Sequence, residues 1–567
     1  MSSHHELHIS VEHSVSVDIN HICTLSKDIG ALYLSDDYSD VTLIVGGQKL
    51  KSHKIILAAR SQYFRALLFG GLKESTQHEI ELKDANLAGF KGLLEYIYTG
   101  QMPLAEKREE VVLNILGSAH RYGFSELETS ISDYLKEILN IRNICPIFDA
   151  ALLYQLEFLI KVCHKYMDER ACEVMQHENF LQLSADALNK LISRDSFHAP
   201  EIDIFLAVGA WVKANPDPAY KSVLDKVRLS LISITDLLNV VRPTGLVSPE
   251  AILDAIAART QTHNSDLNHR GRLLADLNVA HPMYGAQVLQ GEMRGYLLDG
   301  DTNNYDMERG YTRHTITELR EHCILVKLGT QCIINHVKML LWDKDMRSYS
   351  YYLEVSMDQK RWIRIIDYTE YFCRSWQYLY FQPRIVLYIR IVGTNNTVNK
   401  VFHLVSFEAY YTNHTENLYD GFVIPTRNVA IMGQGATVTE GVCRSRNALL
   451  NGDTSNYDWD SGYTCHQVGS GSILVQLGQP YVIDSMRLLL WDCDDRSYSY
   501  YIEVSGNSRS WILVADKRKE SCRSWQTIRF TARPVVFIRI VGTHNTANEV
   551  FHCVHFECPA QGDDDDD

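Results

Sequence analysis

A segment near the carboxy terminus occurs twice, and this repeat constrains the fold more than any other feature of the chain. Residues 298–314 read LDGDTNNYDMERGYTRH, and residues 450–466 read LNGDTSNYDWDSGYTCH. The correspondence continues in LWDKDMRSYSYYLEVS from Leu341 and LWDCDDRSYSYYIEVS from Leu490. Each copy runs for about 130 residues, more than a solenoid repeat, so each is expected to fold as a domain of its own.

Within each copy, apolar and polar residues alternate between the turns. Tyr349, Tyr351, Leu353 and Val355 form one such series, in which β-branched and aromatic side chains dominate. A period of two with these residue types is typical of half-buried strands. The pattern predicts a compact all-β unit, a sandwich or a jelly roll.

Both copies resemble the discoidin family, also called F5/8 type C or galactose-binding-like. The resemblance rests on the early DG or NG turn, the Tyr-x-(Leu/Ile)-Glu-Val-Ser strand, a following Trp (Trp362, Trp511) and the closing Ile-Arg-Ile strand. It implies jelly rolls over residues 282–412 and 442–558. Members of this family bind ligands through loops at one end of the sandwich and usually have no catalytic role.

Two kinds of side chain in these loops are candidates for substrate contact. Trp459 lies in a turn rich in Gly and Asp, where a large aromatic ring has no evident core strand to face and could anchor a partner. The repeated WDxDxRSYSYY stretch forms either an internal ion-pair loop or a polar contact surface. Its candidate residues are Asp343, Arg347, Asp492 and Arg496.

The same loops are rich in carboxylates, which are the ligands that calcium prefers. The candidates are Asp299, Asp301, Asp306, Asp453 and Asp458. The alternative is that these carboxylates cap their own loops in Asx turns, which needs no ion. We expect the second arrangement and assign no metal and no cofactor.

Ahead of the repeats the apolar period becomes helical, as at Ile22, Leu25, Ile29 and Leu32, and two short strands lie between the predicted helices. An α+β domain is therefore expected over residues 23–139. It resembles the BTB/POZ family in DVTL at Asp40, HKIILAARSQYFRALL and YIYTG.

The BTB/POZ resemblance implies a dimerisation module. Asp40 and Lys54 match family positions that form a charged pair at the subunit boundary, and Ile22 and Leu25 are expected in the same dimer interface. Family members that recruit cullin-3 carry a hydrophobic-x-Glu motif, which Leu72-Lys73-Glu74 matches. Leu72 and Glu74 are therefore the predicted cullin-binding residues.

Residues 140–260 have a helical pattern throughout and resemble the BACK domain, for example in EIDIFLAVGAWV from Glu201. This domain implies a rigid spacer with additional cullin-facing surface. The remaining stretches are expected to be a flexible amino terminus (1–22), polar linkers (261–281, interpreted as a hinge, and 413–441) and an acidic tail (559–567).

The composition excludes several classes of function. Lys and Arg number 55 against 70 Asp and Glu, a net charge of −15, so no nucleic-acid partner is expected. The chain has no signal-like start and no run of about 20 apolar residues, which predicts a cytoplasmic protein without membrane insertion. It contains none of the common catalytic motifs, so we do not expect an enzyme.

The predicted fold is therefore multidomain: α+β BTB/POZ, all-α BACK and two all-β discoidin-type jelly rolls. The leading functional hypothesis is a homodimeric adaptor of a cullin-3 RING ubiquitin ligase, whose discoidin pair captures a protein substrate of unknown identity. The alternative is a non-catalytic dimeric scaffold whose discoidin pair binds a protein, a glycan or a lipid headgroup without cullin.

Overall fold

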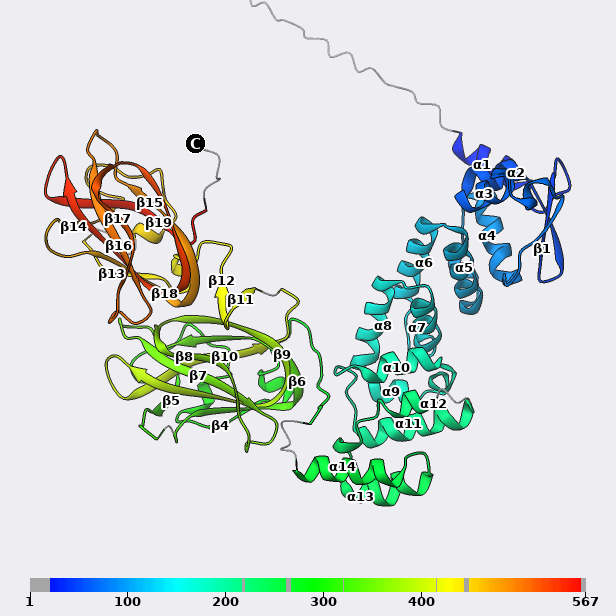
Figure 1. Cartoon of the computed structure of the whole chain (residues 1–567), viewed down its shortest axis with the longest axis horizontal. Coiled ribbons are helices and arrows are strands. Elements are labelled where there is room, and N and C mark those ends of the chain that lie inside the picture. Colours follow the sequence, from blue (N-terminus) through cyan, green and yellow to red (C-terminus); the bar gives the residue numbers. More distant parts are fainter. Residues whose placement is uncertain are drawn as a thin grey trace, which may run out of the picture. The chain divides into compact units, whose positions relative to one another are not determined.

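The computed structural model of the chain describes residues 21–216, 220–261, 267–319, 321–414, 416–442 and 448–561 (Figure 1). The chain divides into two compact units: Met1–Leu191 with Ala210–Tyr220, and Ile192–Gly209 with Lys221–Asp567. Residues 1–20 of the predicted amino-terminal extension and residues 562–567 of the predicted acidic tail lie outside the described residues.

The first unit begins with a three-stranded sheet covered by helices. Strand β1 (Val41–Val45) pairs antiparallel with β2 (Gln48–Ser52) and parallel with β3 (Glu79–Glu81). The helices are α1 (Ile22–Gly30), α2 (Lys54–Arg60), α3 (Gln62–Phe69), α4 (Leu87–Thr99), α5 (Glu109–Tyr122) and α6 (Ser125–Glu137). Their core includes Phe64, whose ring stacks on that of Tyr122 at 5.2 Å. The predicted α+β domain is confirmed.

Helices α4 and α5 approach closely because α4 presents glycine to its neighbour. A Cβ placed on Gly89 would lie 2.2 Å from the carbonyl oxygen of Asn114, so no larger residue fits there without moving a backbone. Glycine inside a helix costs about 1 kcal/mol relative to alanine, and the close packing of α4 on α5 offsets that cost.

An all-α region follows, as the sequence predicts. Its helices are α7 (Ile144–Leu153), α8 (Glu157–Glu169), α9 (Ala171–Gln176), α10 (Ala185–Ser193), α11 (Glu201–Ala214), α12 (Tyr220–Leu224), α13 (Ile234–Asp236) and α14 (Pro249–Gln261). Their apolar faces form the core, and the indole of buried Trp211 donates to the carbonyl of Leu183 at 2.8 Å.

Most of the second unit consists of two all-β copies (Figure 1). In the first, the strands follow the order β5-β10-β6-β9-β7-β8, with β4 on β6. The bounds are β4 (Gln287–Gln290), β5 (Thr312–Thr315), β6 (Ile324–Leu341), β7 (Tyr349–Ser356), β8 (Ile363–Cys373), β9 (Trp376–Asn396) and β10 (Val401–Tyr410).

The second copy has the order β11-β12-β15-β18-β16-β17, with β13 on β15 and with β19 pairing β14 and β15. The bounds are β11 (Asn417–Tyr419), β12 (Phe422–Ile424), β13 (Thr437–Glu440), β14 (Thr464–Gln467), β15 (Ile473–Leu490), β16 (Tyr498–Ser505), β17 (Ile512–Cys522), β18 (Trp525–Asn545) and β19 (Val550–Glu557). The predicted repeat of one all-β domain is confirmed.

The two copies join through buried amides. Gln479 of the second copy accepts from the backbone N–H of Tyr378 at 2.6 Å and donates to the Tyr378 carbonyl at 2.9 Å. Gln377 of the first copy donates to the carbonyl of Gly478 at 2.8 Å. Both glutamine side chains are fully buried. Because each buried amide has partners, the junction replaces the hydrogen bonds that the groups would make to water.

The linkers also carry structure. From the 413–441 linker, Val423 of β12 pairs with Tyr481 of β15, while the Phe422 ring stacks on Tyr368 of the first copy at 5.8 Å. In the 261–281 stretch, the N–H of Val279 donates to Ala409 at 2.9 Å. The hinge interpretation therefore does not hold for residues 267–281, which are bonded to the domains around them.

Candidate functional site

The segment that carries the predicted cullin motif projects an apolar side chain from the end of α3. After Gly71, which has φ of +76°, Leu72 adopts an extended conformation and its side chain is 50% exposed. A short 3-10 helix, Lys73–Thr76, follows, and the hydroxyl of Ser75 donates to the Leu72 carbonyl at 2.6 Å. Glu74 is partly exposed on this turn. An apolar side chain and a carboxylate are thus presented together.

Asp40 and Lys54 both serve this region within the single chain. Asp40 accepts from the backbone N–H of Lys54 at 2.8 Å, which satisfies a free donor at the start of α2. The Lys54 ammonium donates instead to the carbonyl of Ser75 at 3.1 Å. Their pairing between subunits stays a prediction. Ile22 and Leu25, the other predicted interface residues, are 68% and 60% exposed on α1.

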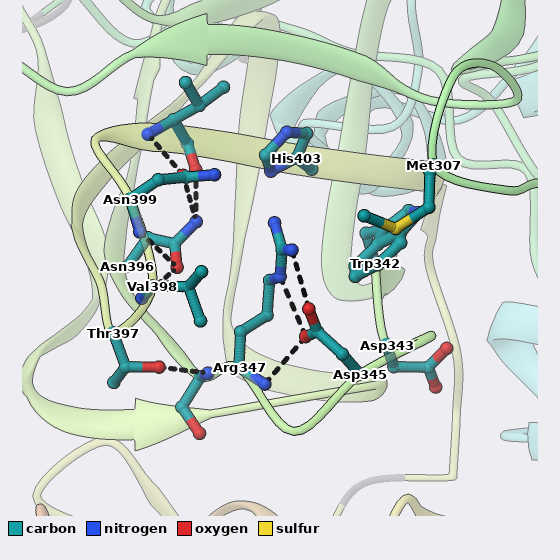
Figure 2. Close-up of polar contacts among 12 residues, drawn as sticks. Met307, Trp342, Asp343, Asp345, Arg347, Asn396, Thr397, Val398, Asn399 and His403 are labelled. Carbon is teal, nitrogen blue, oxygen red and sulfur yellow. Dashed lines mark hydrogen bonds and ion pairs between the residues drawn. The ribbon is translucent and has the colours of Figure 1, made fainter.

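At the loop end of the first discoidin copy, Arg347 forms an internal ion pair (Figure 2). Its guanidinium lies 4.3 Å from the ring centre of Trp342 and donates to both oxygens of Asp345 at 2.8 and 2.7 Å. These bonds hold the pKa of Asp345 below its usual range. The Arg347 side chain is only 7% exposed, which agrees with the internal ion-pair loop, and a role of this stretch in polar contact stays a prediction.

The second copy repeats this arrangement. The Arg496 guanidinium lies 4.1 Å from the ring centre of Trp491 and donates to both oxygens of Asp494 at 2.7 Å. The bonds from Arg496 lower the pKa of Asp494 to about 2. Trp459 packs edge-on against Trp491 at 4.8 Å between ring centres and is 62% exposed. The predicted anchor residue therefore packs on the Trp491 and Arg496 side chains.

The other two predicted contact residues, Asp343 and Asp492, accept hydrogen bonds from tyrosines. The hydroxyls of Tyr305 and Tyr457 donate to them at 2.6 Å each. Burial, together with the bond to Asp492, raises the pKa of Tyr457 to about 12. Asp343 and Asp492 thus fasten the neighbouring turn, and their outer faces remain partly exposed.

Sequence reasoning missed several residues at the same loop end. Thr394–Lys400 line a surface cavity of about 840 Å³. Asn396 accepts from the N–H of Val398 at 2.9 Å and donates to the Val401 carbonyl at 2.7 Å, which presents Val398 to solvent (Figure 2). On β10, the strand that follows this loop, burial lowers the pKa of His403 to about 4. The recurring VGT and VFH segments that flank this loop were the available signal.

The calcium candidates use their oxygens within their own turns. Asp301 accepts from the N–H groups of Asn303 and Asn304, both at 3.0 Å, and Asp306 accepts from Glu308 and Arg309 at 2.8 and 3.0 Å. Asp299 accepts from Asp301, and Asp453 and Asp458 repeat these turns in the second copy. These are Asx turns. Over the described ranges, no group of three or more His, Cys, Asp or Glu side chains is placed to hold a metal ion.

In the described part of the chain, no helix is both long enough and apolar enough to cross a bilayer.

Family models match three parts of the chain. The BTB/POZ domain matches residues 29–139, the BACK model (BTB And C-terminal Kelch) matches residues 144–242, and the F5/8 type C domain matches residues 436–556. These matches agree with the α+β, all-α and all-β parts of the structure.

Two solved structures are similar to parts of the chain. The BTB domain of human Gigaxonin is 22% identical, with a TM-score of 0.18, and the match covers 24% of this chain and 100% of that one. The CBM32 of AlyQ in complex with 4,5-unsaturated mannuronic acid is 16% identical, with a TM-score of 0.19. The match covers 22% of this chain and 92% of that one.

Curated relatives match nearly the whole chain. BTB/POZ domain-containing protein 9 of Homo sapiens is 57% identical over 96% of this chain and 89% of its own length. The Drosophila melanogaster protein of the same name is 53% identical over 94% of this chain and 74% of its own length. Human Kelch-like protein 6 is 28% identical over 37% of this chain and 34% of its own length. The chain belongs to the BTB/POZ domain-containing protein 9 family.

Proposed function

We propose that the chain is a dimeric substrate-recognition adaptor of a cullin-3 RING ubiquitin ligase. The observation that carries this proposal is the Leu72–Glu74 turn, where an exposed apolar side chain stands beside a carboxylate at the end of α3. An apolar anchor that fills a pocket, with a carboxylate to orient it, is a common form of interface hot spot.

A second surface supports cullin docking from the BACK side. Helix α6 and the start of α8 line a cavity of about 450 Å³, which includes the exposed ring of Phe158 and the carboxylates Glu128 and Asp133. It offers the same combination of apolar and acidic groups as the Leu72–Glu74 turn. We propose that cullin-3 contacts both.

Dimerisation would proceed through α1. Its exposed Ile22 and Leu25 lie three positions apart and therefore share one face of the helix. A homodimer would carry four discoidin copies, and linked sites gain effective concentration without new contacts.

The discoidin pair would capture a protein substrate at its loop ends. Trp459 and Val398 are exposed on loops that the Trp–Arg–Asp stacks and the Asn396 bonds hold in place. The adaptor itself would do no chemistry and bind no cofactor: holding a substrate lysine near the charged conjugating enzyme is catalysis by proximity. We propose that it acts in the cytoplasm, in keeping with the described cysteines, which are free thiols.

Co-precipitation with cullin-3 tests the proposal. Leu72→Ala and Glu74→Ala should each lower cullin-3 recovery at least about tenfold, since interface anchors of this kind carry 1.4 kcal/mol or more. Lys73→Ala, which changes an exposed residue between them, is the matched control. If the wild type recovers no cullin-3, or the two variants recover as much as wild type, the dimeric scaffold that works without cullin replaces this proposal.

A further inference from the structure

Arg270 lies in the stretch that the sequence assigns to a polar linker, yet its side chain is 1% exposed. Burying a guanidinium is costly unless it is paired and its N–H groups have acceptors. A linker that only spans a gap has no use for such a residue.

On one side, Arg270 is anchored in the BACK domain. Its Nε and Nη2 donate to the two oxygens of Glu201, the first residue of α11, at 2.7 and 3.1 Å. Its Nη1 donates to the carbonyls of Ile192 and Arg194 at 2.7 and 2.8 Å. Glu201 also accepts from the backbone N–H of Arg228 at 2.7 Å. The planar fork of arginine suits this bidentate pairing, which lysine cannot reproduce.

On the other side, the same three residues of backbone are bonded to the first discoidin copy. The side chain of Gln331 donates to the Arg270 carbonyl at 2.7 Å, and the N–H of Arg272 donates to the Gln331 carbonyl at 2.9 Å. Between them, the N–H of Gly271 donates back to Asp195 of the BACK domain at 2.9 Å. A Cβ on Gly271 would lie only 2.9 Å from a methyl group of Ile385, so the chain is tightly enclosed here.

We infer that Arg270 is a positioning residue, which joins the carboxy-terminal part of the BACK domain (192–209 and 221–261) to the first discoidin copy as one rigid body. The buried amides of Gln377 and Gln479 then extend that body to the second copy. The functional consequence rests on the proposed adaptor role: a captured substrate is held at a fixed distance from the carboxy-terminal part of the BACK domain (192–209 and 221–261). A fixed offset limits which substrate lysines can be reached.

The test uses the full-length chain with spin labels introduced as noncanonical amino acids at exposed Glu250 and Lys360. The wild type should give one narrow distance distribution, and Arg270→Ala should broaden it. Amide exchange of peptides covering residues 268–273 should become on the order of tenfold faster in that variant, a loss of 1.4 kcal/mol of local stability. Arg272→Ala removes an exposed arginine from the same segment, two residues from Arg270. It should leave the distance distribution and the exchange rate as in wild type.

Arg270→Ala strands the carboxylate of Glu201, so a variant that removes both charges keeps the inference falsifiable if the single variant does not fold. Arg270→Met with Glu201→Met should recover part of the thermal stability lost in Arg270→Ala, because an apolar pair can replace a buried ion pair while the carbonyls of Ile192 and Arg194 and the N–H of Arg228 still lose their partners. It should not recover the narrow distribution. A distribution that stays narrow in either folded variant, or is already broad in the wild type, overturns the inference.

Self-ubiquitination by a reconstituted cullin-3 ligase then measures the consequence. Modified lysines should be confined to a few sites in wild type and spread over more sites in the Arg270→Met, Glu201→Met variant. If no modification occurs at all, the adaptor role fails, while the distance measurement still decides whether the junction is rigid.

Discussion

The two discoidin copies have equivalent cores and equivalent Trp–Arg–Asp stacks in their loops. One face, however, is buried in the first copy and its equivalent is partly exposed in the second. When the copies are aligned at Trp342 and Trp491, Gln377 corresponds to Gln526. Gln377 is fully buried against the second copy, whereas Gln526 is partly exposed. The aromatic neighbours Phe372 and Tyr378 are replaced by the polar pair Ser521 and Thr527. The copies share this glutamine, and the neighbouring residues that differ accompany its burial at an interface in the first copy only.

The two copies also use equivalent positions to contact the part of the chain that precedes each of them. The long strands β6 and β15 each lose register at two places against β9 and β18, and the first of these lies between Lys327 and Cys332 in β6 and between Gln476 and Tyr481 in β15. In the first copy, Gln331 at this irregularity donates to the carbonyl of Arg270, which precedes the copy. In the second copy, Gly478 at the equivalent irregularity accepts from Gln377 of the first copy. One structural position thus docks the preceding module in both copies, with different side chains.

The largest effect should come from breaking the junction at Gln479. Gln479→Ala removes the hydrogen bonds to the partly buried N–H and C=O of Tyr378 and should cost about 1–3 kcal/mol for each group left unsatisfied. The equivalent change in the first copy, Thr330→Ala, affects a partly exposed side chain and should stay within about 0.5 kcal/mol. Urea unfolding of the two variants measures the difference. Equal losses would contradict the inference that the side chain at this position bonds across the junction in the second copy but not in the first.

A smaller effect should be shared equally by both copies. Burial, aided by the charges of Arg347 and Arg496, lowers the pKa of His403 and of His552 from 6.5 to about 4. Because the folded state disfavours protonation, the stability that each neutral imidazole contributes is complete above pH 6.5 and is lost as the pH falls toward 4.

Replacing either histidine should therefore remove the same part of this pH dependence. His403→Gln and His552→Gln should each reduce the fall in unfolding free energy between pH 7 and pH 5 by on the order of 1 kcal/mol. Urea midpoints at the two pH values measure it. A change in one variant only would show that the two loop-end stacks are not equivalent.

The smallest effect on stability should be found at the turn where Trp459 of the second copy takes the place of Met307 in the first. Trp459→Met gives the second copy the residue that the first has at Met307, and both positions are exposed, so stability should change by less than about 0.5 kcal/mol. Partner capture should nevertheless fall, since a large aromatic anchor is lost. Proximity labelling with the two chains, compared by quantitative mass spectrometry, measures this; identical partner sets would exclude Trp459 as an anchor.

Much of the fold was predictable because its signals are local or repeated. The period-two alternation from Tyr349 to Val355 identified strands, and the duplicated segment identified a domain used twice. The loop-end chemistry was predictable only in part. Asp343 and Asp345 flank the same loop, and only the folded backbone decided that Asp345 pairs with Arg347 while Asp343 accepts from Tyr305.

By itself, the sequence determined the order of the domains and their fold classes, and it predicted the Leu72–Glu74 turn as a cullin-docking motif, because periodicity and short motifs are properties of neighbouring residues. Only the tertiary structure decided which polar residues are buried. Arg270 and Glu201 are 69 positions apart, and Gln377 and Gly478 are 101 apart. A polar residue is stable in the interior only if a partner is brought to it, and for these residues the partner comes from another module of the chain.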